Sequence, residues 1–222
     1  MKVEISYFPP EKVISVPDPE STYPFVIDGE IKYIVDFSLF LQSDIHEELF
    51  CKWMNNPYYY PIYSLAEIYD SQQEEYEELF QMQNMAFTYM KGSRKNTLFV
   101  KVVIRTPHQF NQYFPYLYGN GSMHNLSLWS LKQDGFWLEE REYEASYPIK
   151  RTRKNRTILV KPKWLAITPV VTLAENSTMF WVGHDGDFIT AFSSDEQFST
   201  VESLQKIVPE NIELVAVDYA WE

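Results

Sequence analysis

TMFWVGHDGDFITAF, residues 178–192, sets two runs of aromatic and β-branched residues on either side of the segment GHDGD. Such residues fit the pleated surface of a strand, and Asp-Gly supplies the positive φ angles of a tight hairpin turn. The stretch therefore predicts an antiparallel hairpin with Asp185-Gly186 at its tip. Because the same pattern recurs in the chain, we expect hairpins to supply much of the sheet.

Two more hairpins are predicted from this pattern. Residues 24–37 carry Asp28-Gly29 between β-rich runs, and residues 125–144 carry Asp134-Gly135. Further strands are expected where apolar side chains alternate or cluster in short β-branched runs, namely at residues 96–106, 156–162, 168–173 and 211–219.

Three helices are expected between these strands. Ser43 can cap a short helix at 44–56, in which Ile45, Leu49 and Trp53 share a face, and Ser194 can cap another at 195–208. Ser64 and Glu67 have the spacing of a capping box, an apolar stripe runs from Leu65 to Phe87, and Gly92 stands where a helix stop belongs. This pattern predicts the longest helix at about 65–90.

Together these elements predict an α+β fold. Its largely antiparallel sheet is built from hairpins in the second half of the chain and is packed with two or three helices. We expect a single compact domain over residues 1–222. The alternative is a split into a helix-rich acidic part at 1–92 and a β-rich part at 93–222.

The composition of the chain limits where the protein can reside and which covalent links it can form. Apolar residues make up 45% of the 222, and the 16 Tyr exceed what a core needs, so some rings are expected at the surface. The one cysteine, Cys51, excludes a disulfide within the chain. The N-terminus lacks a signal-peptide pattern and no apolar run approaches the roughly 18 residues that span a bilayer. A soluble, cytoplasmic protein without membrane contact is expected.

The charge is distributed unevenly. Residues 1–90 hold 4 basic and 16 acidic residues, residues 91–163 hold 14 and 5, and residues 164–222 hold 1 and 10. The basic stretch KRTRKNRTILVKPKW, residues 150–164, could bind an anion or be neutralised by the protein's own carboxylates. Its candidate binding residues are Arg151, Arg153, Lys154 and Arg156. We expect chiefly internal neutralisation, because the flanking segments are so acidic.

The acidic counterpart is the run DSQQEEYEELF, residues 70–80. On the predicted helix its carboxylates lie away from the apolar stripe, where they can face water, dock on the basic stretch or receive a basic partner. These residues are Asp70, Glu74, Glu75, Glu77 and Glu78.

Signals for catalysis are weaker. His184, Asp185 and Asp187 could form an acid–base or cation site, but the same residues are what a hairpin tip needs. Residues 116–125, YLYGNGSMHN, lack the phosphate-loop and dinucleotide signatures and are expected to form a flexible connection. No metal-ligand spacing occurs, so neither a metal nor a cofactor is expected. An enzyme would need a site assembled from separated residues, namely His108, His124, His184, Asp185 and Asp187.

The resulting expectation is a non-enzymatic, acidic protein-binding module that captures a basic protein partner. Immunity proteins and antitoxins that block basic toxins share this general composition, so an inhibitor of a toxin is one form of it. The first alternative is an enzyme with a site assembled from separated His and Asp residues. The second is a nucleic-acid binder that uses residues 150–163, which the acidic remainder of the chain disfavours.

Overall fold

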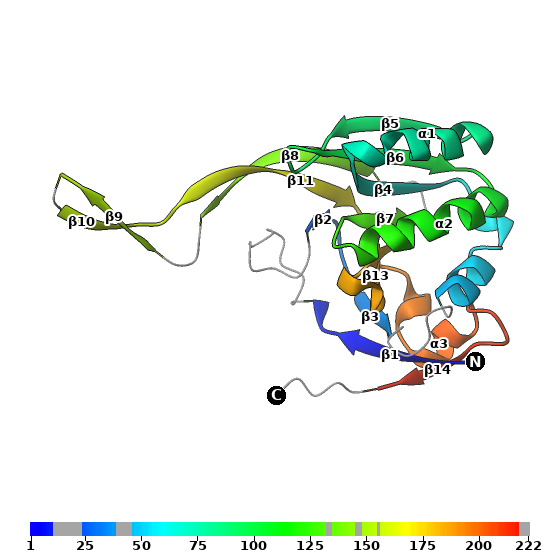
Figure 1. Ribbon diagram of the computed structural model, residues 1–222. Helices are drawn as coiled ribbons and strands as arrows, with labels where there is room; N and C mark the ends of the chain where they lie inside the picture. The colour runs from blue at the N-terminus through cyan, green and yellow to red at the C-terminus, as the bar shows by residue number, and fades with distance from the viewer. Residues whose placement is uncertain (11–23, 39–45, 132–134, 145–147, 155, 218–222) are drawn as a thin grey trace.

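The computed structural model describes residues 1–10, 24–38, 46–131, 135–144, 148–154 and 156–217 (Figure 1). Its strands are β1 (Lys2–Phe8), β2 (Val26–Asp28), β3 (Tyr33–Ser38), β4 (Ile62–Tyr69), β5 (Ala86–Lys91), β6 (Thr97–Ile104), β7 (Ser127–Ser130), β8 (Gly135–Glu144), β9 (Ile149–Arg153), β10 (Arg156–Val160), β11 (Lys163–Thr172), β12 (Thr178–Val182), β13 (Phe188–Ser193) and β14 (Glu213–Ala216). Its α-helices are α1 (Gln73–Met82), α2 (Pro107–Ser122) and α3 (Val201–Gln205). Shorter helical segments are η2 (Glu47–Cys51), η3 (Pro57–Tyr59), η4 (Asp70–Gln72), η5 (His184–Gly186) and η6 (Glu196–Phe198).

Nine strands form the main sheet, in the order β14-β1-β3-β13-β12-β7-β4-β6-β5. All its ladders are antiparallel except the one between β1 and β14. Strands that are distant in sequence lie side by side in this sheet, since β1 pairs with β14 and β3 pairs with β13. The predicted α+β fold with a largely antiparallel sheet is therefore confirmed. Among the described residues, no helix is both long and apolar enough to cross a membrane.

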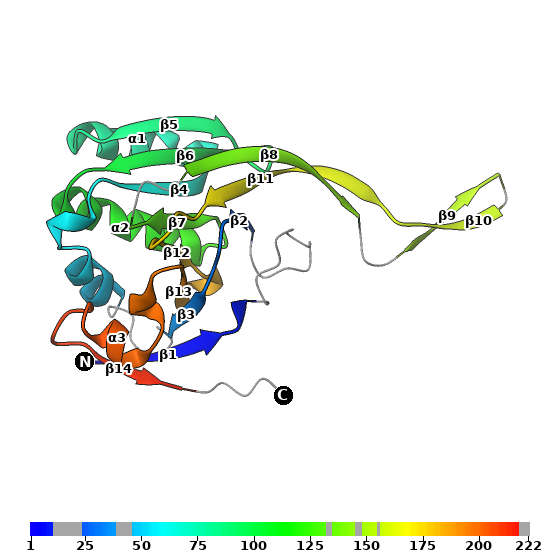
Figure 2. The same cartoon turned by 180° about the vertical axis from the view of Figure 1, so that it is seen from behind.

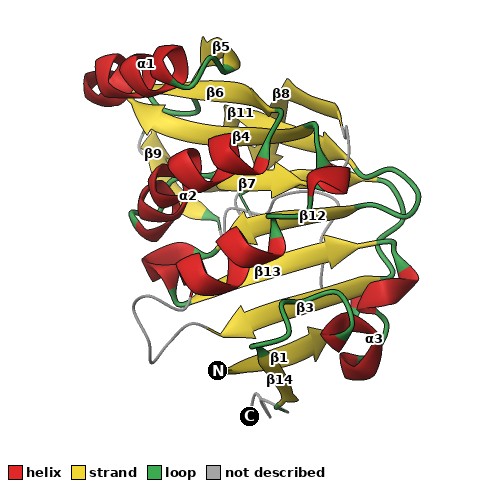
Figure 3. Ribbon diagram, turned by 90° about the vertical axis from the view of Figure 1, so that its right-hand side faces the viewer, coloured by secondary structure: helices red, strands yellow, loops and turns green. Residues whose placement is uncertain are grey.

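The helices cover one face of the main sheet (Figure 3). Successive strand residues alternate between the two faces of the sheet. On β12, Phe180 and Val182 face the helices, whereas Met179 and Trp181 face the opposite side. Phe110, Phe114 and Leu117 of α2 reach this core on the helix side, where all three are buried. Rings supply much of this core, and Trp129 and Phe180 stack with centroids 5.1 Å apart. The abundance of aromatic residues is thus largely a property of the packing.

A small three-stranded sheet, β2-β11-β8, covers part of the opposite face. Ile27 of β2 and Val171 of β11 pack there against Trp181 and Phe192 of the main sheet. Burial on both faces explains why the central strands read as nearly continuous apolar runs, since neither side of them meets water. The protein thus has a helical layer, a main sheet and a partial third layer.

The three predicted hairpins have different outcomes. The hairpin at 178–192 is confirmed, because β12 and β13 pair antiparallel across η5. The hairpin at 24–37 is wrong, because β2 pairs with β11 while β3 pairs with β1 and β13. The hairpin at 125–144 is also wrong, because β7 joins the main sheet and β8 joins the small one. In both cases a local turn signal connects strands whose partners are distant in sequence.

The predicted helix at 65–90 is wrong. Residues 62–69 form β4, α1 occupies only 73–82, and residues 86–91 form β5. The apolar spacing of Leu65 and Ile68 comes from burial on opposite faces of a central strand rather than from one face of a helix. Asn84, with φ 52°, ends the turn that follows α1.

The longest helix is instead α2, at 107–122. Thr106 caps it by accepting a hydrogen bond from Gln109 N at 3.2 Å, and Pro107 occupies its first turn. The glycines of residues 116–125 predict a flexible connection there, but residues 116–122 are helical. Tertiary packing overrides these weak breakers, since Leu117 is fully buried.

The remaining helix predictions hold in part. Leu49 and Trp53 are buried in a helical segment, while Ser43 and Ile45 lie outside the described residues. The helix at 195–208 is broken into η6 and α3, and Ser194 caps neither of them. Asp195 caps η6 and Thr200 caps α3. The strand predictions at 96–106, 156–162, 168–173 and 211–219 correspond to β6, β10, part of β11 and β14.

Candidate functional site

The most conspicuous feature of the molecule is a two-stranded arm. Strands β8 and β11 pair over ten residue positions, and they run from the body to β9 and β10 (Figures 1 and 2). The arm is anchored where β11 enters the core, since Val170 and Val171 are buried. Further out, Leu165 is 69% exposed. The arm therefore begins as part of the small sheet and continues without support from the body.

The tip of the arm is a hairpin made by β9 and β10, which we call the arm tip (residues 149–160). Lys154 takes up a left-handed backbone conformation at its turn, with φ 51°. Arg151 lies directly opposite Ile158, and Lys150 lies directly opposite Leu159. Directly opposed residues share a face and successive residues alternate, so Arg151, Arg156 and Ile158 belong to one face and Lys150 and Leu159 to the other.

The arm tip concentrates positive charge. Lys150, Arg151, Lys154 and Arg156 are all exposed, and none of them forms an ion pair with any other described residue. The side chain of Arg153 lies outside the described residues, although its backbone pairs with Arg156. Ile158 and Leu159 are 46% and 65% exposed beside these cations. The tip thus presents both charge and apolar surface to solvent.

Several charges on β8 and β11 are paired locally. Glu139 Oε2 lies 2.7 Å from Arg141 Nη2, and the indole of Trp137 donates to Glu139 Oε1 at 2.7 Å. The indole N–H, followed by the guanidinium, lowers the pKa of the Glu139 carboxyl. Lys163 pairs with Glu142 at 2.5 Å. Among the described residues, the ion pairs of the arm therefore lie on β8 and β11 and not at the arm tip.

The expected neutralisation of the basic stretch by the flanking acidic segments is not found among the described residues. Ile158 lies ten residues before Thr168, where β11 becomes buried. At about 3.3 Å per residue, the tip stands up to roughly 30 Å from the body. The screening length at physiological salt is about 8 Å. Among the ion pairs between described residues, the pair of Lys163 and Glu142 follows the expectation.

The acidic cluster predicted at 70–80 lies on η4 and α1, far from the arm tip in both views (Figures 1 and 2). Tyr76, Leu79 and Phe80 pack inward. Four of the five predicted carboxylates are exposed and Glu77 is half-buried. Glu77 accepts a hydrogen bond from Gln73 at 2.7 Å. The cluster thus lies apart from the arm tip, whereas docking between the two was one of the expected arrangements.

The histidines considered for catalysis are dispersed. His108 lies in the first turn of α2 and His124 follows its C-terminus. Because a helix rises about 1.5 Å per residue, the two ends of α2, where these histidines lie, are about 24 Å apart. His124 Nε2 lies 2.9 Å from Asp185 Oδ1, and Tyr118 donates to the Gly186 carbonyl at 2.8 Å.

These contacts attach the end of α2 to the turn between β12 and β13. Asp187 is half-buried in that turn, and the side chain of His184 lies outside the described residues. No group of three or more His, Cys, Asp or Glu side chains in the described part of the chain could hold a metal ion.

The prediction that Glu67 caps a helix is wrong. Glu67, predicted as a capping residue, lies on β4 with only 6% of its surface exposed. Its Oε1 accepts hydrogen bonds from Ser93 N at 2.8 Å, Ser93 Oγ at 2.5 Å and Thr97 Oγ1 at 2.5 Å. Arg94 Nη2 lies 3.6 Å from Oε2. These bonds organise the turn between β5 and β6, so the role of Glu67 is structural.

A second carboxylate, Asp36, lies in a polar row across the main sheet. Ser6, Asp36 and Thr190 are neighbours in the ladders of β1, β3 and β13. Burial raises the pKa of Asp36 to about 6. Thr190 lies beside this carboxyl and partly offsets the rise in its pKa. The sequence offered no signal for this row, because it forms only when three separate strands align.

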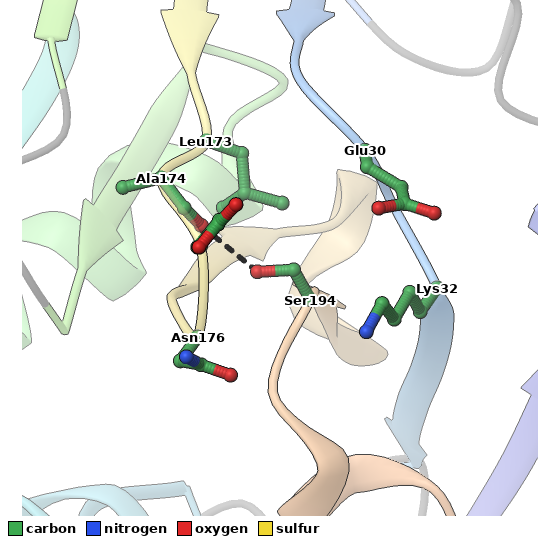
Figure 4. A pocket seen from close by; sticks show the side chains of 7 residues that line it. Glu30, Lys32, Leu173, Ala174, Asn176 and Ser194 are labelled. Carbon is green, nitrogen blue, oxygen red and sulfur yellow. Dashed lines mark hydrogen bonds between the residues drawn. The ribbon is translucent and has the colours of Figure 1, made fainter.

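A hollow of about 260 Å³ lies beside the β11–β12 turn. Figure 4 shows the side chains that line it. Its lining residues are Glu30, Lys32, Leu173, Ala174, Glu175, Asn176 and Ser194. Ser194 Oγ donates to the Ala174 carbonyl at 2.8 Å and accepts from Ser177 N at 3.2 Å. Lys32 Nζ lies 3.1 Å from Glu196 Oε1. The hydroxyl and the ammonium are thus both engaged in holding local structure.

Comparison of the chain with protein-family models, with curated proteins and with solved structures finds no match.

Proposed function

We propose that this protein is a binding module that holds an anionic macromolecular partner at the arm tip. The observation that carries the proposal is a projecting hairpin whose four described cations have no ion-pair partner among the described residues. A fold gains nothing in stability from cations held apart from its own carboxylates. Such cations are available for steering a partner of opposite charge and for fixing its register.

The exposed aliphatic side chains of the arm also support this proposal. Ile158, Leu159 and Leu165 lie on the arm and are among the exposed large apolar residues of the protein. An isolated two-stranded ribbon is marginally stable in water, and apolar residues at a binding surface contribute when a partner covers them. A partner at the tip would therefore stabilise the arm as well as use its charge.

The test is a variant without the arm tip. Glu144 and Lys163 are directly opposed in the β8–β11 ladder, so residues 145–162 can be replaced by Asn-Gly to close a two-residue hairpin. Binding to heparin, a defined polyanion, is then measured by calorimetry at low and physiological salt. We expect the wild type to bind with salt-sensitive affinity and the shortened variant to lose binding.

A control separates the position of the charges from their number. Lys91, Lys95 and Lys206 are exposed on the body and form no ion pair within the described residues. Changing all three to Gln should leave heparin binding nearly unchanged, whereas changing Arg151, Lys154 and Arg156 to Gln should weaken it. Equal losses in the two triple variants would contradict the proposal.

The second candidate function is capture of a basic protein partner by the acidic surface of η4 and α1. It is supported by the exposed carboxylates of that surface, none of which has a cationic partner among the described residues. Met82, 78% exposed at the end of α1, adds apolar area beside them. An immunity-like inhibitor of a basic toxin would use such a surface.

This candidate is tested by affinity capture from the native host with the wild type and with a variant carrying Glu74→Gln, Glu75→Gln and Glu78→Gln. A stoichiometric basic protein that is captured by the wild type and by the arm-tip variant, but lost from the glutamine variant, is the expected result. Retention of the same protein by the glutamine variant would reject the acidic surface as its site.

A further inference from the structure

We infer that the anionic partner of the arm tip is double-stranded DNA, which the hairpin enters through the major groove. This inference rests on the proposed function, because it names the partner of the same site. Three properties of the tip carry it: its dimensions, the arrangement of its side chains and its separation from the acidic body.

The dimensions of the tip fit a groove. β9 and β10 pair over five positions, so the tip is about 17 Å long, and its two strands lie about 4.8 Å apart. The major groove of B-form DNA is about 12 Å wide and admits a two-stranded ribbon. The major groove of an RNA duplex is deep and too narrow for side chains to read. The shape therefore favours DNA over RNA as the duplex.

The side chains of the tip match a duplex in chemistry. Arg151 and Arg156 share a face with Ile158, while Lys150 and Leu159 occupy the other face. A guanidinium presents a planar fork of donors that fits phosphate oxygens and the edge of guanine. Aliphatic side chains contact thymine methyl groups in the major groove. Both faces thus combine a cation for the backbone with an apolar group for the base edges.

The arm also explains how a protein with an acidic body can bind DNA. The net charge of the chain is −12, which repels a polyanion from the body. The tip extends up to roughly 30 Å from the buried part of β11, several times the screening length of about 8 Å. DNA held at the tip is therefore screened from most of the acidic surface. An acidic protein partner would gain from the same cations, but it has no groove for the ribbon.

The experiment measures fluorescence anisotropy of labelled probes with the full chain. The probes are a DNA duplex of about 24 base pairs, one of its single strands, an RNA duplex of the same sequence and polyglutamate. We expect the DNA duplex to bind most tightly. If each of the four cations neutralises one phosphate, the logarithm of the association constant should fall with the logarithm of salt concentration with a slope of about −3.5.

Two variants distinguish insertion into a groove from simple attraction between charges. Changing Arg151, Lys154 and Arg156 to Gln should reduce the salt slope by about one for each phosphate that is no longer neutralised. Ile158→Ser should weaken duplex binding about tenfold, the scale expected for an apolar side chain that becomes buried, without changing the salt slope. The body variant with Lys91, Lys95 and Lys206 changed to Gln should match the wild type in both quantities.

The outcomes separate this inference from the function on which it rests. If polyglutamate binds as tightly as DNA, or if the RNA duplex or the single strand binds more tightly, double-stranded DNA is not the partner. The proposal of an anionic partner would still stand. A normal affinity of the Ile158→Ser variant would overturn insertion into the groove. If the wild type binds neither DNA nor heparin at low salt, the proposed function fails together with this inference.

Discussion

Thr97 Oγ1 donates a hydrogen bond to Glu67 Oε1 at 2.5 Å, and both side chains are almost excluded from water. The pair joins β6 to β4 at the position where the chain turns from β5 into β6. Glu67 also receives two hydrogen bonds from Ser93, so one carboxylate oxygen satisfies three donors.

The first prediction concerns this carboxylate. Glu67→Ala should lower the free energy of unfolding by about 2–4 kcal/mol, because it leaves buried donors without an acceptor. Glu67→Gln keeps one acceptor oxygen and should cost less than Glu67→Ala. Urea denaturation measures both, with Glu78→Ala on the exposed face of α1 as the control, where a change within about 0.5 kcal/mol is expected. A Glu67→Ala variant as stable as the control would reject the structural role.

The second prediction concerns Asp36. Its pKa is about 6 in the folded protein and 3.8 in its ordinary state, so the folded protein binds the proton more tightly than the unfolded one. This carboxyl therefore does not destabilise the fold below about pH 4. Its destabilising effect grows between about pH 4 and pH 6, and above pH 6 it levels off at no more than about 3 kcal/mol.

Asp36→Asn removes the titrating group. The variant should gain stability relative to the wild type as the pH rises from 4 to 8, measured by urea denaturation at intervals of pH. Asp70→Asn, at an exposed position, serves as the control and should follow the wild type. A constant difference between Asp36→Asn and wild type across this range would refute the assignment.

The third prediction compares two glycines of α2. A Cβ at Gly119 would meet no atom within 4 Å, whereas a Cβ at Gly121 would lie 2.5 Å from the Val182 side chain. Gly119→Ala should raise stability by up to about 1 kcal/mol through helix propensity. Gly121→Ala should lower it by about 1–3 kcal/mol through overpacking against β12. Thermal unfolding of the two variants should shift in opposite directions, and shifts of the same sign would contradict the close approach of α2 to β12.

The fourth prediction concerns the turn between β12 and β13. Replacing His184 and Asp187 together by Ala should change the free energy of unfolding by less than about 1 kcal/mol, as is usual for turn residues outside a core. Asp185→Asn, which neutralises the exposed carboxylate beside His124, should also cost less than about 1 kcal/mol. Loss of a measurable catalytic activity in the double variant, with the fold intact, would instead favour the enzymatic alternative.

Local patterns in the sequence were reliable where the partners of a strand are its neighbours in the chain. The hairpin at 178–192 is an example, because Asp185 and Gly186 adopt the positive φ angles that its turn requires. The basic and acidic stretches were also visible as such. Charge is read directly from residue types, whereas the position of a charge on the fold is not.

The pairing between distant segments could not be predicted from local patterns. Residues 62–69 have an apolar spacing that suits a helix, yet they form a central strand because β6 and β7 lie on either side of them. The arm follows from the same cause, since β8 and β11 pair with each other beyond the point where the body can support them. The α+β class and the basic character of residues 150–164 could be predicted from the sequence, because composition and local periodicity are properties of single segments. The tertiary structure decided that these cations project from the fold, because strand pairing is a property of two segments at once.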